Sequence, residues 1–323
     1  MPIQCVRIND IRIDKSRFAC KGILSGDDDL EPHIERSLQD FGVLTPVLVY
    51  RDNCGEYHLI DGFKRIRFAR QSGLTAVEAV VMPESTPAEE IVAIIFYNKL
   101  SRIKKSAISK IRFVLFALDL GASEERVLKF ICPPLELKPH RSFIEECRRI
   151  HGLPAELKEF CHEKRFSLKQ ILNLAYYPHD LLVHIMAWKP LLHLSASVLD
   201  EVASNLKDYL RANNKTVSDF AKDDEVEGII NSGLNPRERT ERLRRLIHER
   251  RYPTLTGVNA KIQKMVDELN LPEEINISWD RTLENRRADL SIHPESAKEW
   301  NDLMNILNAA ETARAIGNIL NEL

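Results

Sequence analysis

The chain has 323 residues, of which 44% are hydrophobic and 29% are charged. This composition is ordinary for a soluble globular protein and provides apolar material for more than one core, so two or three domains are expected. The formal net charge of −2 excludes an attraction to nucleic acid through bulk charge. Glycine (12 residues) and aromatic residues (7%) are scarce, which favours helices over an all-β fold.

The six cysteines are widely spaced and form no CxxC pair, which excludes a zinc ribbon and gives no support to a disulfide framework. They are Cys5, Cys20, Cys54, Cys132, Cys147 and Cys161. His151 and His162 lie near Cys161 and could be metal ligands, although ordinary structural residues are the simpler interpretation. No apolar run reaches 18 residues and the N-terminus lacks a signal-peptide core. We therefore expect a soluble, cytoplasmic protein with no membrane partner.

The first 83 residues alternate strand and helix signals. Residues 3–8 alternate as a strand, and residues 30–42 place Leu30, Ile34, Leu38 and Phe41 on one helical stripe. The remaining signals predict strands over 46–50, 57–60 and 76–82, a turn over 52–55, and a short helix over 62–73. These elements predict a small α+β unit.

Helical periodicity dominates after Thr86. The predicted helices lie near 86–100, 105–119, 123–131, 139–150, 154–164, 167–176, 195–211 and 236–250. Residues 222–228 and 233–239 are interpreted as connections. The tail predicts strands over 274–281 and 287–294 and one long amphipathic helix over 295–320. Such a ββα unit is too small to bury its own apolar face, so it is expected to pair with a second copy.

Charge is distributed unevenly along the chain. Residues 101–170 hold 15 Lys and Arg against 9 Asp and Glu, an excess of +6, which leaves −8 for the rest of the chain. This segregation favours a basic surface on the middle of the molecule.

The stretch LIDGFKRIRFARQSGL, residues 59–74, places four cations directly after a strand that ends in glycine. The amide groups at a helix N-terminus already carry partial positive charge, so cations there are unfavourable unless an anion balances them. Gly62 with Lys64, Arg65 and Arg67 therefore indicates a phosphate site. The alternative is a solvated basic helix face. Asn98 and Arg102, one turn apart, could add contacts to a phosphate or a sugar, or form a surface polar pair.

The order of these elements resembles the N-terminal domain of the ParB family, over roughly residues 1–105. The family pattern is a helix ending in SI…G…P, two strands, then GERRxRA and AGL. The residues at matching places are Ser37, Gly42, Pro46, Gly62, Arg65, Arg67, Ala69 and Gly73–Leu74.

This resemblance implies a domain that binds CTP together with Mg²⁺ and acts as a gate. The GERR loop would hold the phosphates, and a later ENxxR element would contribute to the triphosphate and its metal. The implied site consists of Gly62, Phe63, Lys64, Arg65, Arg67, Asn98 and Arg102. Phe63 and Lys64 replace the glutamate and first arginine of GERR, and Tyr97 stands at the glutamate of ENxxR, with the step from Asn98 to Arg102 one residue longer. The lost carboxylate favours binding over efficient hydrolysis.

The same domain resembles sulfiredoxin and carries a nuclease label in its family. Cys54 lies in a turn and no cysteine stands beside the phosphate loop, which argues against sulfiredoxin chemistry. The cluster of carboxylates needed for a two-metal nuclease is also missing from the loop.

Residues 98–131 and 140–175 resemble the helices around the helix-turn-helix of the ParB central domain, with Leu153–Pro154, Leu157 and Ala175 in step. The resemblance implies that the second helix presents His140, Arg141 and Ser142 to DNA bases. Lys138, Arg148 and Arg149 would contact phosphates.

The turn of this motif departs from the family pattern. Residues 131–140 separate the two helices by roughly ten residues, where the motif has three or four. The segment is therefore either a helix-turn-helix with an enlarged turn or a helical scaffold that does not read DNA. Glu145 and Glu146 would repel phosphates if they faced the groove.

These observations predict an α+β ParB/sulfiredoxin-like domain over 1–103, an all-α helix-turn-helix-like domain over 104–225, and a linker with the ββα unit over 226–323. The predicted function is that of a nucleotide-responsive, DNA-binding ParB-like protein in chromosome or plasmid partition or in transcription regulation. Its expected partners are DNA, a second copy of the chain and a Walker-type ParA-like ATPase, and its expected place is the nucleoid. The alternatives are a nucleotide hydrolase or nuclease of the same fold, and a non-enzymatic helical adaptor in a mobile-element system. The dimer face would hold Trp279, Leu290, Ile292, Trp300, Leu303 and Leu307.

Overall fold

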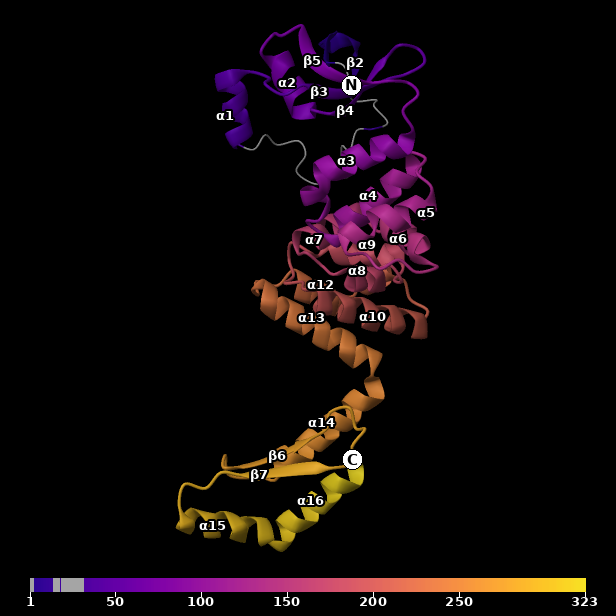
Figure 1. Cartoon of the computed structure of the whole chain (residues 1–323). Helices are drawn as coiled ribbons and strands as arrows, with labels where there is room; N and C mark the ends of the chain where they lie inside the picture. Colours follow the sequence, from indigo (N-terminus) through magenta and orange to yellow (C-terminus); the bar gives the residue numbers. More distant parts are fainter. Residues whose placement is uncertain (1–2, 14–17, 19–31) are drawn as a thin grey trace. The chain divides into compact units, whose positions relative to one another are not determined.

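The computed structural model describes residues 3–13, 18 and 32–323, so the predictions that fall on Cys20 and residues 30–31 lie outside the described residues. The chain divides into two compact units, Met1–Ala187 with Ser195–Asp200, and Trp188–Leu194 with Glu201–Leu323 (Figure 1). The three predicted domain boundaries stay a prediction. In the described part of the chain, no helix combines the length and the apolar character needed to cross a membrane.

The first unit begins with a five-stranded mixed sheet in the order β1-β5-β3-β4-β2. Its strands are β1 (Ile3–Arg7), β2 (Ile11–Arg12), β3 (Val47–Arg51), β4 (Tyr57–Asp61) and β5 (Ala76–Met82). β3 pairs with β5 and β2 with β4 in parallel, whereas the β1–β5 and β3–β4 pairs are antiparallel. The predicted α+β unit is confirmed. β2 was not predicted because two residues are too few to show an alternating pattern.

Helix α2 (Phe63–Gln71) packs on this sheet through Ile66 and Ala69, both fully buried. They join a core that includes Val47 and Val49 of β3 and Ala79 of β5. The other elements of this region are the 3-10 turn η1 (Ile8–Asp10) and helix α1 (Pro32–Phe41). Only Gly62 separates the end of β4 at Asp61 from the start of α2 at Phe63. This turn, from Asp61 to the first turn of α2, is the β4–α2 corner.

The rest of the first unit is helical, as predicted. Its elements are α3 (Ala88–Ile103), α4 (Ala107–Asp119), α5 (Glu124–Arg126), the π-helical turn η2 (Val127–Ile131), the 3-10 turn η3 (Pro133–Leu135), α6 (Phe143–His151), α7 (Ala155–Glu163), α8 (Leu168–Leu174) and α9 (His179–Ala187). The predicted start of a helix at 139 is wrong, because α6 begins at Phe143 with Ser142 as its N-cap residue. Ser106 caps α4 by accepting a hydrogen bond from the Ser109 amide.

The second unit contains more helix than predicted. Helix α10 (Ala196–Ala212) begins in the first unit and continues into the second. The other elements of the second unit are α11 (Val217–Ala221), α12 (Asp224–Ile230), α13 (Pro236–Arg251), α14 (Pro253–Glu268), β6 (Ile275–Trp279), β7 (Ala288–Ile292), α15 (Ala297–Asn308) and α16 (Ala310–Glu322). The interpretation of 222–228 as a connection is wrong, because α12 forms there with Asp223 as its cap.

The single helix predicted over 295–320 is broken at Ala309, whose ψ of 134° is extended. Neither glycine nor proline encodes this break. Its cause is tertiary packing, because it lets Ile319 of α16 reach Ile262 of α14 and Trp279 of β6. Leu303 and Leu307 of α15 instead pack with Ile275.

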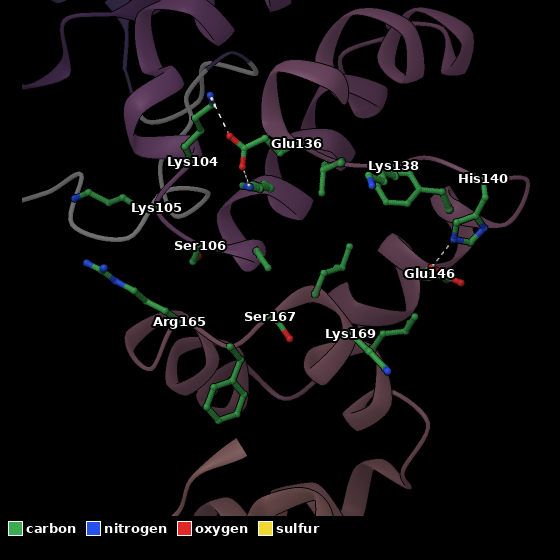
Figure 2. Close-up of a pocket in the computed structure, with 17 residues that line it drawn as sticks. Lys104, Lys105, Ser106, Glu136, Lys138, His140, Glu146, Arg165, Ser167 and Lys169 are labelled. Carbon is green, nitrogen blue, oxygen red and sulfur yellow. Dashed lines mark ion pairs between the residues drawn. The ribbon is translucent and has the colours of Figure 1, made fainter. Parts of the chain in front are cut away.

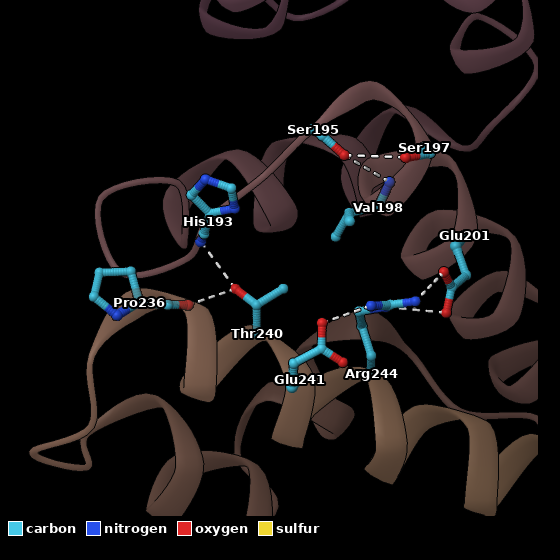
Figure 3. A network of polar contacts seen from close by, with 9 residues as sticks. All are labelled: His193, Ser195, Ser197, Val198, Glu201, Pro236, Thr240, Glu241 and Arg244. Atoms are coloured by element: carbon cyan, nitrogen blue, oxygen red, sulfur yellow. Dashed lines mark hydrogen bonds and ion pairs between the residues drawn. The ribbon is translucent and has the colours of Figure 1, made fainter.

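A buried arginine joins three segments of the second unit. The Arg239 side chain, on a residue only 9% exposed, donates from Nη1 to the Leu191 carbonyl (2.8 Å) and from Nη2 to the carbonyls of Ser232 (2.6 Å) and Leu234 (2.9 Å). The neighbouring Thr240 hydroxyl accepts from the His193 amide (2.9 Å) and donates to the Pro236 carbonyl (2.7 Å) (Figure 3). Side-chain donors therefore satisfy the carbonyls of the loops beside α13.

Arg250 makes a charged contact with the start of α12. It donates to Asp223 at 2.7 Å and to Glu225 at 2.9 Å. The hydrogen bond from Arg250 holds the pKa of Asp223 below its ordinary value. A carboxyl whose pKa is lowered by folding stabilises the native state above its unfolded pKa and loses this effect as the pH falls through its folded pKa.

We therefore expect Asp223→Asn to reduce stability at neutral pH and to flatten the acid dependence of unfolding below about pH 4. Asparagine keeps the capping role, so the loss is specific to the charge. Urea unfolding at pH 6 and pH 3, followed by hydrogen exchange in α12 and α13, measures it. Asp224→Asn, at the exposed neighbouring position, is the control. Equal pH profiles for the two variants would contradict this assignment.

Candidate functional site

Gly62 occupies the corner between β4 and α2 in the left-handed region, with φ 108°. A Cβ atom there would lie 2.7 Å from Val47 Cγ1 and 3.0 Å from Val47 Cβ. Both the backbone conformation and the space therefore demand glycine. Gly62 is the N-cap residue of α2 and has no side chain to cap the helix. The amide groups at a helix N-terminus are the type of donor that binds anions.

Arg65 holds this corner in place. Its Nη1 donates to the carbonyls of Thr45 (2.9 Å) and Pro46 (2.6 Å), and its Nη2 donates to Asp61 Oδ2 (3.0 Å). The guanidinium group thus ties the first turn of α2 to the segment that enters β3. The structure gives Arg65 a positioning role that the sequence did not predict, and its direct contact with a phosphate stays a prediction.

Asp61 also connects the corner to α3. Its Oδ1 lies 3.9 Å from Nζ of Lys99, a side chain that is only 15% exposed. The second half of α3 therefore lies beside the corner, and Arg102 falls on the same helical face three residues after Lys99. Asn98 and Arg102 are predicted from the sequence, whereas Lys99, whose side chain makes the contact, is not.

Tyr97 does not face the corner. It is 68% exposed and lines, with Phe96 and Phe130, an apolar hollow of about 270 Å³ between α3 and η2. The assignment of Tyr97 to the glutamate of ENxxR stays a prediction.

The other predicted nucleotide residues have mixed exposure. Phe63 packs against the core of the sheet. Lys64 and Arg102 are half-buried, while Arg67 and Asn98 are exposed. These positions agree with a surface site at the corner, and their contacts with a nucleotide stay a prediction.

Asp52, Glu56 and His58 bring their ligand atoms within 4.8 Å of one another and are the candidate metal ligands among the described residues. Asp52 caps the β3–β4 turn and lies 2.9 Å from His58 Nε2, and Glu56 pairs with Arg12. The group lies at the far end of β4 from Gly62, about 13 Å away at strand geometry. It cannot serve a phosphate at the corner.

A second candidate site lies between α4, η3, α6 and α8. This basic cleft has a volume of about 570 Å³ (Figure 2). Six Lys and Arg residues and two Glu residues line it: Lys104, Lys105, Lys110, Lys138, Arg165, Lys169, Glu136 and Glu146. Ser106 and Ser167, the N-cap residues of α4 and α8, also face it. The charge, the caps and the hollow shape are suited to an anionic ligand.

Few of these cations are neutralised. Glu136 lies 3.9 Å from Lys104 Nζ and 4.0 Å from Lys110 Nζ, and Glu146 lies 3.2 Å from His140. Across the described chain, no ion pair is found for Lys105, Lys138, Arg165 or Lys169. The cleft therefore has an excess of positive charge.

The predicted DNA-binding residues form two groups. Lys138 and His140 line the cleft, and the exposed Arg141 and Ser142 follow them before α6. Because α6 starts at Phe143, His140 and Arg141 precede the helix and do not form its first turn. Arg148 and Arg149 lie in the last turn of α6. Arg148 is 3.8 Å from Glu124, and Arg149 is 3.6 Å from Glu145 and stacks 4.4 Å over Tyr176.

His162, considered above as a metal ligand, is part of the packing between α4 and α7. Its Nδ1 lies 2.7 Å from Ser106 Oγ. Burial lowers the pKa of His162, which favours the neutral ring. Cys132, Cys147 and Cys161 are buried free thiols, and burial raises the pKa of Cys132 to about 11.

Comparison with protein families covers the N-terminal part of the chain. Residues 7–96 match the model of the ParB N-terminal domain. Within this domain the match includes the β4–α2 corner and ends in α3, one residue before Tyr97. The basic cleft lies outside the matched residues.

Two probable chromosome-partitioning proteins ParB, from Neisseria meningitidis serogroups A and B, are each 26% identical to the chain over 174 residues. The aligned region covers 54% of this chain and 57% of those proteins, so the chain spans little more than half the length of these curated ParB relatives.

Solved ParB structures are also similar. They are the C-terminally truncated Caulobacter crescentus protein, complexed with CTP-gamma-S or with the centromeric parS site, and a Pnob8-like ParB-N domain. Their identities are 18%, 18% and 16%, and their TM-scores 0.25, 0.31 and 0.34. They cover 58%, 62% and 79% of this chain and 98%, 98% and 96% of their own lengths. At these TM-scores the likenesses carry no argument about ligands.

Proposed function

We propose that the chain is a ParB-like protein that binds DNA under the control of a nucleotide, CTP, and acts in partition or in transcription regulation. The observation that carries this proposal is the left-handed Gly62 at the start of a helix, followed by three cations, within the residues that match the ParB N-terminal domain. This arrangement combines backbone donors with fixed positive charge, which is what a polyphosphate needs.

Each residue of the corner has a defined task in this proposal. The amides at the start of α2 and the side chains of Lys64 and Arg67 bind phosphate oxygens. Arg65 and Lys99 hold Asp61 and the corner in shape. Asp61 already faces these two cations, so a Mg²⁺ ion would be held mainly by the phosphates themselves. Because Asp61 is already paired with Arg65 and Lys99, it is poorly placed to orient water, and the site is suited to binding more than to turnover.

The helical part supplies the contacts with DNA. Lys138 and the cations of the basic cleft contact phosphates, and His140, Arg141 and Ser142, at the start of α6, approach base edges. The long segment between η2 and α6 acts as an enlarged turn. Arg148 and Arg149 extend the basic surface at the other end of α6.

The tail supports self-association in part. Trp279, Leu303 and Leu307, predicted for a dimer face, are buried within the second unit. Leu290, Trp300 and Ile306 remain exposed at 47%, 45% and 38% and provide the apolar surface for a second copy. A ParA-like ATPase is the further partner that the family resemblance suggests.

The nucleotide site is tested by titrating the purified chain with CTP and with ATP in a calorimeter. CTP is expected to bind, and Lys64→Ala is expected to weaken it about tenfold, because a charged hydrogen bond to phosphate contributes about 1.5 kcal/mol or more. Arg70→Ala is the matched control, since Arg70 is an exposed cation in the last turn of the same helix. No binding of either nucleotide at millimolar concentration would remove the nucleotide role.

A further inference from the structure

Glu136 is an acidic residue placed where the basic cleft needs an anion. It follows η3 with a φ of 60°, a left-handed conformation that is uncommon for a residue with a side chain. Its side chain is 78% exposed, yet its two carboxylate oxygens lie near two different lysines, Lys104 and Lys110. Figure 2 draws both ion pairs as dashed lines from the Glu136 carboxylate.

The contacts of Glu136 are long. Distances of 3.9 and 4.0 Å are beyond hydrogen-bond range, so each lysine is attracted to the carboxylate without being bound to it. Two anionic oxygens that each face one ammonium group are also the arrangement that a backbone phosphate would present. Lys105, Lys138, Arg165 and Lys169 add four cations that Glu136 does not neutralise.

The lining of the cleft favours a polyanionic backbone over a small nucleotide. Phe143 and Phe166 are the phenylalanines of the cleft, and both are buried (2% and 6% exposed), so neither ring offers a face on which a base could stack. The imidazole of His140, which also lines the cleft, lies 3.2 Å from Glu146. Five of the six cations are lysines, which act as point charges and do not select a fixed fork geometry. The cleft therefore recognises charge spread over a surface.

We propose that the basic cleft binds backbone phosphates of DNA and that the carboxylate of Glu136 occupies the phosphate position between Lys104 and Lys110 until DNA displaces it. This proposal rests on the DNA-binding function proposed above and adds a residue that opposes it. Exposed ion pairs are weak, so displacement of the Glu136 side chain into solvent is easy. Glu136 thus weakens the binding of a ligand that brings a single phosphate. DNA brings several phosphates into the cleft together, and these displace the Glu136 carboxylate.

The experiment measures the anisotropy of a labelled DNA duplex at 50 and 200 mM salt. Glu136→Gln is expected to bind about two- to fivefold more tightly than the unchanged chain at 50 mM salt, the range that an exposed ion pair allows. The difference is expected to shrink at 200 mM salt, because screening weakens the competing charge. The matched control is Glu125→Gln, which removes an exposed carboxylate on α5 outside the cleft and is expected to change affinity by less than twofold.

A double variant separates competition from a general charge effect. In a Lys104→Ala, Lys110→Ala background, DNA binding is expected to weaken and Glu136→Gln is expected to lose its effect, because its partners are gone. Equal affinities for Glu136→Gln and Glu125→Gln, with DNA bound by both, would overturn the role of Glu136 alone. Failure of every variant to bind DNA would overturn the proposed DNA-binding function as well.

Discussion

Replacing Gly62 by alanine is expected to lower the free energy of unfolding of the N-terminal sheet region by about 2–5 kcal/mol. The left-handed backbone of this corner costs a non-glycine residue about 1–2 kcal/mol. Forcing a methyl group to within 2.7 Å of the buried Val47 Cγ1 adds about 1–3 kcal/mol of overpacking. Urea titration followed by hydrogen exchange in β3, β4 and α2 measures the change, and CTP affinity is expected to fall with it.

Gly73→Ala is the matched control for this experiment. Gly73 also has a positive φ (73°), but a Cβ atom there would meet nothing within 4 Å. Its cost is therefore limited to the backbone, about 1–2 kcal/mol. If Gly62→Ala and Gly73→Ala lower the free energy of unfolding equally, the side chain of Val47 does not exclude a methyl group at position 62.

Replacing Arg239 by methionine is expected to destabilise the second unit by about 3 kcal/mol or more. Methionine keeps most of the buried volume but leaves the carbonyls of Leu191, Ser232 and Leu234 without their donors. Each unsatisfied buried acceptor costs about 1–3 kcal/mol, reduced where water can reach it. Hydrogen exchange at α13 and at residues 188–194 is the measurement, because this unit need not unfold together with the first.

Arg237→Met provides the comparison at an exposed position two residues earlier in the same helix. A surface substitution of this kind is expected to change stability by less than about 0.5 kcal/mol. Equal protection of residues 188–194 in both variants would show that Arg239 does not join the loops.

The alternating and helical patterns of the sequence predicted most elements of the first unit. In these elements the buried residues recur with the period of a strand or of a helix, so the pattern of apolar residues indicates the structure. β3, β4 and β5 fall within one or two residues of their predicted ranges. The break at Ala309 was not predictable, because no breaker residue marks it and its cause is packing against α14. α12 was missed because acidic residues hide a short apolar stripe of Val226 and Ile230.

The candidate sites also contain residues that the sequence predicted and residues that it did not. Gly62 and its cations were recognisable because they lie within a few residues of one another in the chain. Lys99 was missed, because only the tertiary contact with Asp61 shows which side of α3 faces the corner. The charge excess over residues 101–170 predicted a basic surface, but of the residues that line the cleft only Lys138 and His140 were predicted by number. Its other cations come from segments 104–110 and 165–169, which fold together but carry no shared motif.

Helix α3 has a consequence for how the two candidate sites communicate. Lys99 contacts Asp61 at the corner, and Lys104, which ends the same helix, contacts Glu136 in the cleft. Five residues of helix separate the two lysines, about 7.5 Å along its axis. A ligand at the corner that displaces Lys99 therefore acts on the helix that also carries Lys104. For the proposed nucleotide and DNA ligands, thermodynamic reciprocity requires that any factor by which the nucleotide changes the affinity for DNA is the factor by which DNA changes the affinity for the nucleotide.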